Sequence, residues 1–314
     1  MTPDIFAEWL SRQKYTVIRT ASSYWYNQVP RVYQAFPYHW IIQPSDCELS
    51  NFLRENKSVG LRYSTSLDAI EGAVSYHAVY ENSVYGFENL GKWARKNVRR
   101  GLKNCNVQPI SFETLAEEGW ALQLDTLDRQ GRRLELAKEI WRKRCLAACD
   151  LPGFEAWGAL VAGRLAASVI TFQMEDCCYM LYQQCHRDYL PVHVNNALSF
   201  VVTQTMINRP QIHSIFYGLH SLDAPSSVDE FKFRMGYTAK PVRQRVVFHP
   251  YLAPLFNRVS HAAVRGLLHW QPGHPTLAKA EGMMRFYLQG KLPLDKQELP
   301  SVLRSADNDL LERD

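Results

Sequence analysis

Residues 154–174 read FEAWGALVAGRLAASVITFQM, and the fold is predicted outward from this stretch. Runs of apolar and β-branched residues flank Ala162-Gly163, which indicates two strands joined by a tight turn. The sequence CCYMLYQQC (177–185) predicts a third strand, and VNNALSFVVTQTMIN (194–208) predicts a helix that Pro210 ends. These elements indicate a mixed α/β class.

The chain continues in the same alternating manner after this helix. IHSIFYG (212–218) predicts a strand, a short helical segment runs into Lys232, and VRQRVVF (242–248) predicts a last strand. The order from residue 154 to residue 249 is therefore strand, strand, strand, helix, strand, short helix, strand. Elements are also predicted outside this region: helices at 2–13, 46–56, 112–128 and 134–149, and strands at 58–65 and 71–81.

The most charged element is FENLGKWARKNVRRGLKNC (87–105), which carries six cations from Lys92 onward and no acid among them. On a helix, Lys92, Lys96, Arg99 and Lys103 share one face, and Leu90, Ala94, Val98 and Cys105 line another. Arg100 adds to the positive side. The pattern has two interpretations, a solvated face of a helix that docks on the core or a surface that contacts phosphates.

A second unusual stretch is FKFRMG (231–236), in which Lys232 stands between Phe231 and Phe233. A lysine in such a position can simply cover apolar surface with its stem while its ammonium stays in water. It can also serve as a fixed cation at a site where negative charge develops. The residues alone leave both interpretations open.

Composition excludes several classes of protein. The chain has 314 residues, of which 46% are hydrophobic and 21% charged, so a folded globular protein is expected. Seven cysteines lack a disulfide-framework spacing or a paired zinc-like motif, and no metal site is predicted. Without a signal-like apolar core or a membrane-spanning run, the chain is expected to be cytoplasmic. The net charge of +5, concentrated at 92–103, is compatible with a polyanionic partner.

The pairing of GKWARKNVRRGLKN (91–104) with YGLHSLDAPSSVDEFKFRMGY (217–237) resembles the GNAT superfamily, and in particular its FemAB-like members, the Fem-type peptidoglycan-bridge aminoacyltransferases and their relatives. Those proteins carry a basic helix and, much later, an FKxxFG motif. Here Met235 stands where the motif has its second phenylalanine, and Tyr217-Gly218 replaces the acidic residue common after the preceding strand.

The resemblance implies a GNAT-type fold with a mixed central sheet. Its expected parts are a degenerate N-terminal GNAT-like lobe at 1–110, a GNAT acyltransferase lobe at 111–250, a helical extension at 251–290 and a flexible tail at 291–314. The apolar faces of the two C-terminal helices are expected to dock on the core, in preference to peripheral contact with a membrane.

The resemblance also implies an acyltransferase that forms an amide on an amine acceptor, with no bound cofactor. GNAT proteins usually hold coenzyme A on a glycine-containing loop, but Leu190, Pro191 and Val192 occupy that loop here. The expected donor is therefore aminoacyl-tRNA in preference to acyl-CoA. A catalytically idle scaffold that binds RNA or a protein partner is the alternative of another class.

Site residues follow from the same resemblance. Lys232 is the expected oxyanion-stabilising cation, and the candidates for proton transfer are His220, Asp223 and Tyr217. Donor contacts are expected from Arg187, Asn195, Asn196, Phe231 and Phe233. Phosphate contacts to tRNA are expected from Lys92, Lys96, Arg99, Arg100 and Lys103.

Overall fold

The computed structural model describes residues 1–131, 137–222, 226–271 and 273–304. The chain divides into two compact units that interleave along the sequence. Unit 1 comprises residues 1–14, 78–218 and 224–238, and unit 2 comprises residues 15–77, 219–223 and 239–314. The lobes predicted from the sequence were continuous ranges, and their boundaries remain a prediction.

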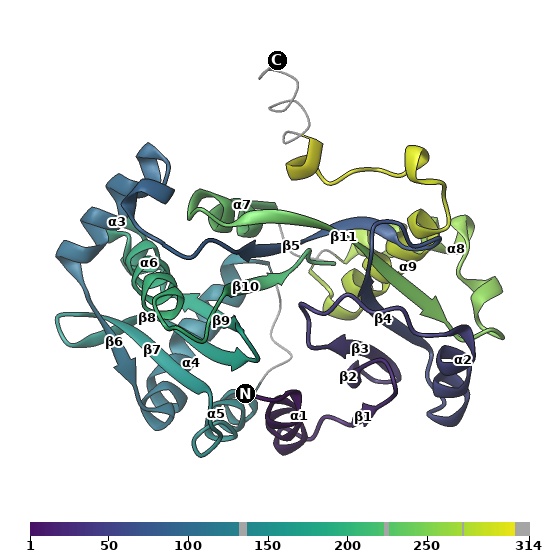
Figure 1. Cartoon of the computed structure of the whole chain (residues 1–314), viewed down its shortest axis with the longest axis horizontal. Coiled ribbons are helices and arrows are strands. Elements are labelled where there is room, and N and C mark those ends of the chain that lie inside the picture. The colour runs from purple at the N-terminus through teal and green to yellow at the C-terminus, as the bar shows by residue number, and fades with distance from the viewer. Residues whose placement is uncertain (132–136, 223–225, 272, 305–314) are drawn as a thin grey trace. The chain divides into compact units, whose positions relative to one another are not determined.

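Among the described residues, the strands of unit 1 follow the order β10-β9-β8-β7-β6 (Figure 1). Their bounds are β6 (Asn106–Ile110), β7 (Phe154–Val161), β8 (Arg164–Met174), β9 (Cys177–Cys185) and β10 (Ser214–Leu219). β6 to β9 pair antiparallel, whereas β10 pairs parallel to β9. The predicted turn at Ala162-Gly163 is confirmed, because both residues adopt the positive φ that so tight a connection demands.

The helices of unit 1 are α1 (Pro3–Arg12), η1 (Phe87–Asn89), α3 (Lys92–Asn104), α4 (Phe112–Arg129), α5 (Lys138–Leu146), η2 (Arg187–Val192), α6 (Val194–Ile207) and α7 (Ser226–Arg234). The helices predicted at 2–13, 112–128 and 194–208 are present in unit 1, and the helix predicted at 134–149 is present as α5, although residues 134–136 lie outside the described residues. α1 begins with Pro3 in its first turn, and α4 begins where the Ser111 side chain accepts a hydrogen bond from the amide of Thr114.

The sheet of unit 1 buries side chains on both faces, because successive residues of a strand point to opposite sides. On one face, Trp157 and Ala159 belong to a core that includes α3 and α6 residues. On the other face, Phe154 and Phe172 stack at 4.2 Å between ring centroids, and Phe6 of α1 packs against both. The sheet therefore packs between two apolar cores.

Unit 2 has its own strands in the order β1-β2-β3-β4-β11. Their bounds are β1 (Val17–Arg19), β2 (Tyr24–Val29), β3 (Val32–Phe36), β4 (Gly60–Thr65) and β11 (Thr238–Phe248), while β5 (Ala73–Tyr80) runs from unit 2 into unit 1. The helices are α2 (Asp46–Glu55), η3 (Ala253–Leu255), α8 (Arg258–Trp270), α9 (Pro275–Gly290) and η4 (Leu294–Lys296).

Two expectations about the C-terminal region are corrected. The apolar residues of α8 were expected to dock on the core, but α8 has no buried residue, and its contact is with α9. A flexible tail was expected from residue 291, but Gln297 is buried and its side chain accepts a hydrogen bond from the amide of Val74 at 2.8 Å. Residues 305–314 lie outside the described residues.

Within the described ranges, no helix combines the length and the apolar character needed to cross a bilayer.

Candidate active site and basic surface

β9 and β10 are hydrogen-bonded over only part of their length and then separate. Their parallel register covers three pairs and ends at Phe216↔Tyr179, although both strands continue. β9 also contains a bulge: the pairs Ser168↔Gln184 and Ile170↔Leu181 are two residues apart on β8 and three on β9. Bulges of this kind redirect side chains near functional sites. The two predicted strands at 177–185 and 212–218 therefore lie in one sheet and splay apart at one end.

A chain of polar side chains links the separated strand ends (Tyr217, Gln183 and Asn195). The Tyr217 hydroxyl on β10 donates a short hydrogen bond to Oε1 of Gln183, which lies at the β9 bulge. Nε2 of Gln183 donates to Oδ1 of Asn195 in the first turn of α6 at 2.7 Å. The expected donor-contact residue Asn195 is thus joined to Tyr217 through a glutamine that the sequence did not single out.

Lys232 enters the same cluster from α7. It is 7% exposed, and its Nζ lies 2.6 Å from Oδ1 of Asp229, one turn earlier on the helix. The ammonium also lies 5.3 Å from the ring centroid of Tyr217. A lysine that only covers apolar surface would extend its ammonium into water, so this interpretation is wrong for Lys232.

The aromatic residues beside Lys232 have a different role from the one their sequence suggests. On helix α7, neighbours in sequence point in different directions, so Phe231 and Phe233 do not enclose the ammonium. Phe231 packs against the core of unit 1, and Tyr217 supplies the ring that faces the cation. The proposed contacts of Phe231 and Phe233 with a donor remain predictions.

The environment of Tyr217 bears on its proposed part in proton transfer. Burial raises the pKa of Tyr217 well above its usual value. Its ring also packs edge-on against Tyr237 at 4.9 Å. A phenol with a raised pKa stays protonated at neutral pH, so Tyr217 is suited to donate a hydrogen bond and poorly suited to accept a proton.

The glycine of the FKFRMG motif holds the end of α7 in place. Gly236 has φ +86°, and a Cβ there would lie 2.8 Å from the carbonyl oxygen of Asn89. The preceding carbonyl, of Met235, accepts a hydrogen bond from the Tyr85 hydroxyl at 2.7 Å. The motif that carries Lys232 is therefore fixed to the segment that leads into the basic helix α3.

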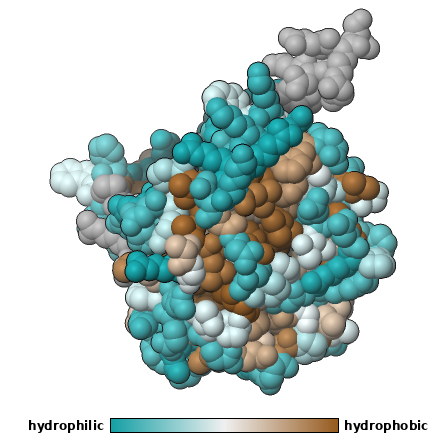
Figure 2. Space-filling view, turned by 90° about the vertical axis from the view of Figure 1, so that its left-hand side faces the viewer, coloured by the Kyte–Doolittle hydropathy of each residue, from teal (hydrophilic) through white to brown (hydrophobic). Residues whose placement is uncertain are grey.

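The basic helix forms as the sequence predicts. Ala94, Val98 and Gly101 are buried, while the five proposed phosphate-contacting residues are exposed: Lys92, Lys96, Arg99, Arg100 and Lys103. Within the part of the chain that the structure describes, no ion pair neutralises these five. They line a shallow groove of about 750 Å³ together with Trp93, which is 74% exposed. Figure 2 shows hydrophilic surface gathered on the upper part of this side of the molecule, where Figure 1 places α3.

α3 packs closely on the start of α6. A Cβ on Gly101 would lie 2.4 Å from the carbonyl oxygen of His193, so glycine is required at this crossing. Burial lowers the pKa of His193, and the positive charges of Arg100 and Lys96 lower it further. The positive potential of α3 therefore reaches the N-terminus of α6, whose dipole has the same sign.

In the loop before α6, where GNAT proteins usually bind coenzyme A, most backbone amides already donate hydrogen bonds within the protein. Here the loop is the 3-10 helix η2, and several of its amides donate within the protein: Arg187 to Asp125, Asp188 to His186, Tyr189 to His186 and His193 to Leu190. Pro191 has no amide hydrogen. A pyrophosphate would find few free backbone donors in this loop.

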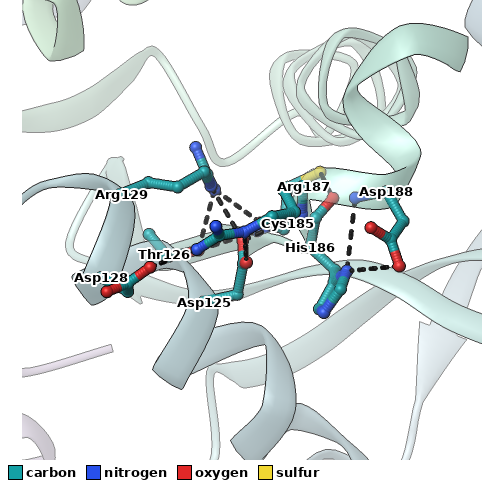
Figure 3. A network of polar contacts seen from close by, with 8 residues as sticks. All are labelled: Asp125, Thr126, Asp128, Arg129, Cys185, His186, Arg187 and Asp188. Carbon is teal, nitrogen blue, oxygen red and sulfur yellow. Dashed lines mark hydrogen bonds and ion pairs between the residues drawn. The ribbon is translucent and has the colours of Figure 1, made fainter.

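Arg187 was expected to contact the acyl donor, but its side chain is paired with carboxylates of α4 (Figure 3). Its guanidinium forms short ion pairs with Asp125 and Asp128 of α4, and Arg129 bonds to the same Asp125 at 2.8 Å. Burial of Asp125 alone would raise the pKa of its carboxyl, but hydrogen bonds from Arg129 and Arg187 hold that pKa below its usual value. This pairing argues against the donor-phosphate contact expected for Arg187.

The remaining candidates are placed as follows. Asn196 donates to the sulfur of Met235 at 3.4 Å, which joins α6 to the FKFRMG motif. His220 belongs to unit 2, where its ring stacks on Tyr76 at 4.6 Å and Nδ1 lies 3.3 Å from the hydroxyl of Ser75. Asp223 lies outside the described residues. Their proton-transfer roles stay predictions.

A parallel strand pair that separates beside the N-terminus of a helix, preceded by an antiparallel meander, is the arrangement of a GNAT-type fold. Comparison with solved structures supports this assignment. The chain resembles a structure titled FemX with a TM-score of 0.55 at 9% identity, over 80% of this chain and 93% of that one. It resembles L-PGS from Bacillus licheniformis with a TM-score of 0.53 at 10% identity, over 81% and 93% of the two chains.

A third solved structure has the same fold, the C-terminal domain of a putative lysylphosphatidylglycerol synthetase from Agrobacterium fabrum. Its TM-score is 0.54 at 11% identity, over 81% of this chain and 92% of that one. No family model and no curated protein matches the sequence. At such low identities, the likeness concerns the fold.

Proposed function

We propose that the protein is an acyltransferase that forms an amide bond, with an aminoacyl-tRNA as donor and an amine as acceptor. The observation that carries this proposal is the buried Lys232–Asp229 pair beside Tyr217, at the point where β9 and β10 separate. A buried cation at this point of the sheet is suited to stabilise an oxygen on which negative charge develops. The likeness of the fold to FemX and L-PGS supports acyl transfer in the broad sense.

The reaction would proceed through a tetrahedral intermediate. The amine nitrogen attacks the carbonyl carbon of the aminoacyl ester, a C–N bond forms, and the carbonyl oxygen becomes an oxyanion that faces the Lys232 ammonium. The C–O bond to the ribose then breaks, and the proton lost by the amine passes to the departing ribose oxygen. Tyr217 would donate a hydrogen bond, while His220 and Asp223 remain the candidates for carrying the proton.

Two features favour a tRNA donor over acyl-CoA. The η2 loop uses several of its amides internally and contains Pro191, so a pyrophosphate has few backbone donors. The exposed cations of α3 offer a surface that can contact several phosphates of a nucleic-acid stem. The exposed ring of Trp93 adds a platform on which a base or a guanidinium could stack.

Donor binding distinguishes these options. Binding of bulk aminoacyl-tRNA should weaken steeply as salt rises, with a slope of about −0.7 to −0.9 per phosphate contacted. Lys96→Glu/Arg99→Glu should flatten this slope by about 2, whereas the matched reversal Arg258→Glu/Arg265→Glu on another exposed helix should leave it unchanged. Tight stoichiometric binding of acetyl-CoA in calorimetry would instead identify an acyl-CoA enzyme.

Turnover separates an enzyme from an RNA-binding scaffold of the same fold. Release of uncharged tRNA should depend on an added amine and on Lys232. A protein that binds charged tRNA with the expected salt slope but shows no amine-dependent deacylation across amino acids, peptides and aminated lipids would be assigned to the scaffold class.

A further inference from the structure

Helix α8 presents an apolar stripe to solvent. Val259 is 80% exposed and Trp270 is 85% exposed, and the small residues Ala262, Ala263 and Gly266 lie between them on the same side at 100° per residue. A Cβ at Gly266 would meet no atom of the described residues within 4 Å. Tyr251 and Leu255, in the segment that precedes α8, are also 88% and 63% exposed.

The opposite side of α8 is the one that contacts the protein. Nε2 of His261 lies 3.0 Å from Oε1 of Glu281 on α9, and Val264 and Leu268 on the same side are only partly exposed. α8 and α9 lie side by side in unit 2 (Figure 1). The apolar stripe therefore faces away from α9. An amphipathic helix is expected to pack its apolar side on its neighbour, and α8 does the opposite.

The charges around the stripe indicate what it binds. Arg258 and Arg265 flank it along one side, about 100° to 120° from its centre. The sequence contains no acidic residue from Phe231 to Ala280. An aromatic residue stands at each end, Tyr251 before the helix and Trp270 at its last position. Apolar residues, flanking cations and terminal aromatic rings suit the boundary between lipid headgroups and acyl chains.

We propose that α8 docks the protein on the surface of an anionic lipid bilayer, with the helix parallel to the surface. Val259 and Trp270 enter the boundary region, and Arg258 and Arg265 contact headgroup phosphates. A second copy of the chain fits less well, because pairing two α8 stripes brings cations together without a carboxylate to balance them. This proposal goes beyond acyl transfer and does not depend on it.

The test is co-sedimentation of the full chain with vesicles. Binding is expected to vesicles containing about a third phosphatidylglycerol and not to pure phosphatidylcholine vesicles. Trp270→Ser should lower the affinity at least about tenfold, since it removes the largest side chain of the stripe. The matched control is Trp93→Ser, which removes an exposed tryptophan from the other basic helix and should leave vesicle affinity unchanged.

Charge reversal supplies the second arm. Each cation near an anionic surface contributes about fivefold to affinity, so Arg258→Glu/Arg265→Glu should cost at least about 25-fold, whereas Lys92→Glu/Lys96→Glu should not. Quenching of tryptophan fluorescence by brominated acyl chains should be lost in Trp270→Ser. Because these side chains are exposed, the variants should keep the parental melting temperature.

Three outcomes would overturn the proposal. The first is no binding to phosphatidylglycerol vesicles. The second is equal affinity of Trp270→Ser and the parent, or a loss caused by the α3 variants alone. The third is a parental dimer in sedimentation velocity that Trp270→Ser converts to monomer without changing vesicle affinity, which would assign the stripe to a second copy.

Discussion

Replacing Lys232 by methionine removes the ammonium while keeping an unbranched stem of similar size. The structure adds a cost that the sequence did not indicate, because Asp229, itself 8% exposed, loses its cationic partner. Breaking a buried ion pair from one side costs about 3 to 5 kcal/mol. Lys232→Met alone should therefore lower the melting temperature, and a loss of activity in this variant would be ambiguous.

The double variant Lys232→Met/Asp229→Asn resolves this ambiguity. It removes both charges together, so most of the stability lost in the single variant should return. Turnover should not return, because no ammonium faces the developing oxyanion. Loss of one such donor costs about 100-fold to 1,000-fold in rate, or about 3 to 4 kcal/mol, and the loss should appear in kcat more than in KM.

The assay is amine-dependent deacylation of charged tRNA at saturating donor, with unfolding followed by circular dichroism on the same samples. Asp229→Asn serves as the matched control, since it keeps Lys232 while removing its partner. A folded double variant that turns over at the parental rate would refute the oxyanion role of Lys232. Recovery of activity with recovery of stability would show that Lys232 acts only through the packing of α7.

Three further outcomes are expected. Reversing charge at Lys96 and Arg99 should weaken tRNA binding most at low salt, where counterion release contributes most, and filter binding at 50 and 200 mM salt measures this. Gly236→Ala should lower the free energy of unfolding by more than about 1 kcal/mol in urea titration, because its φ is +86° and the Asn89 carbonyl lies in the way of a Cβ. The lowered pKa of Asp125 stabilises the folded state above about pH 4, the pKa of an unfolded aspartate, and this contribution is lost as pH falls through the folded pKa. Asp125→Asn should therefore flatten the acid limb of the stability curve, and an unchanged limb would contradict the network in Figure 3.

The order of elements in unit 1 could be predicted because local signals mark its boundaries. Ala162-Gly163 forces a tight turn, Pro210 closes the α6 region, and the cations of α3 fall on one side of a helix. Each signal acts within a few residues, so the sequence contains it whole. The GNAT-type order of strands and helices then follows from the chain direction.

The geometry of the site depends on contacts that no local pattern records. The bulge on β9 lies beside Tyr182, a non-glycine residue at φ +49°, so its sequence gives no warning of the position of Gln183. Asp229 stands three residues before Lys232, a spacing that does predict a contact on a helix. What could not be predicted is that the pair is buried, since burial comes from Tyr217 and from tertiary packing.

The exposure of the α8 stripe also could not be predicted from a local pattern. Periodicity places Val259, Ala263 and Trp270 on one face, but it does not tell whether that face meets the core or the solvent. The contact between His261 and Glu281 fixes the rotation of the helix, and both partners are polar residues that an amphipathic pattern assigns to the surface. The expectation of core docking was wrong for α8, because the side of the helix that contacts α9 is the one that carries His261 and its hydrogen bond to Glu281.

The basic helices α3 and α8 differ in the surface that lies between their cations, which is a groove on α3 and an apolar stripe on α8. This difference determines which polyanion each helix is suited to bind. The exposed cations of α3 line a groove that contains one large aromatic ring, that of Trp93. Electrostatic attraction to phosphates is therefore the main contribution of α3 to binding, and salt screens this attraction. Along α8 the cations border an apolar stripe, whose removal from water is not screened by salt. A nucleic-acid stem offers α3 a row of phosphates but gives the α8 stripe nothing apolar to enter. A bilayer offers α8 both phosphates and acyl chains. With RNA on α3 and lipid on α8, each helix meets a partner that matches both its cations and its apolar groups.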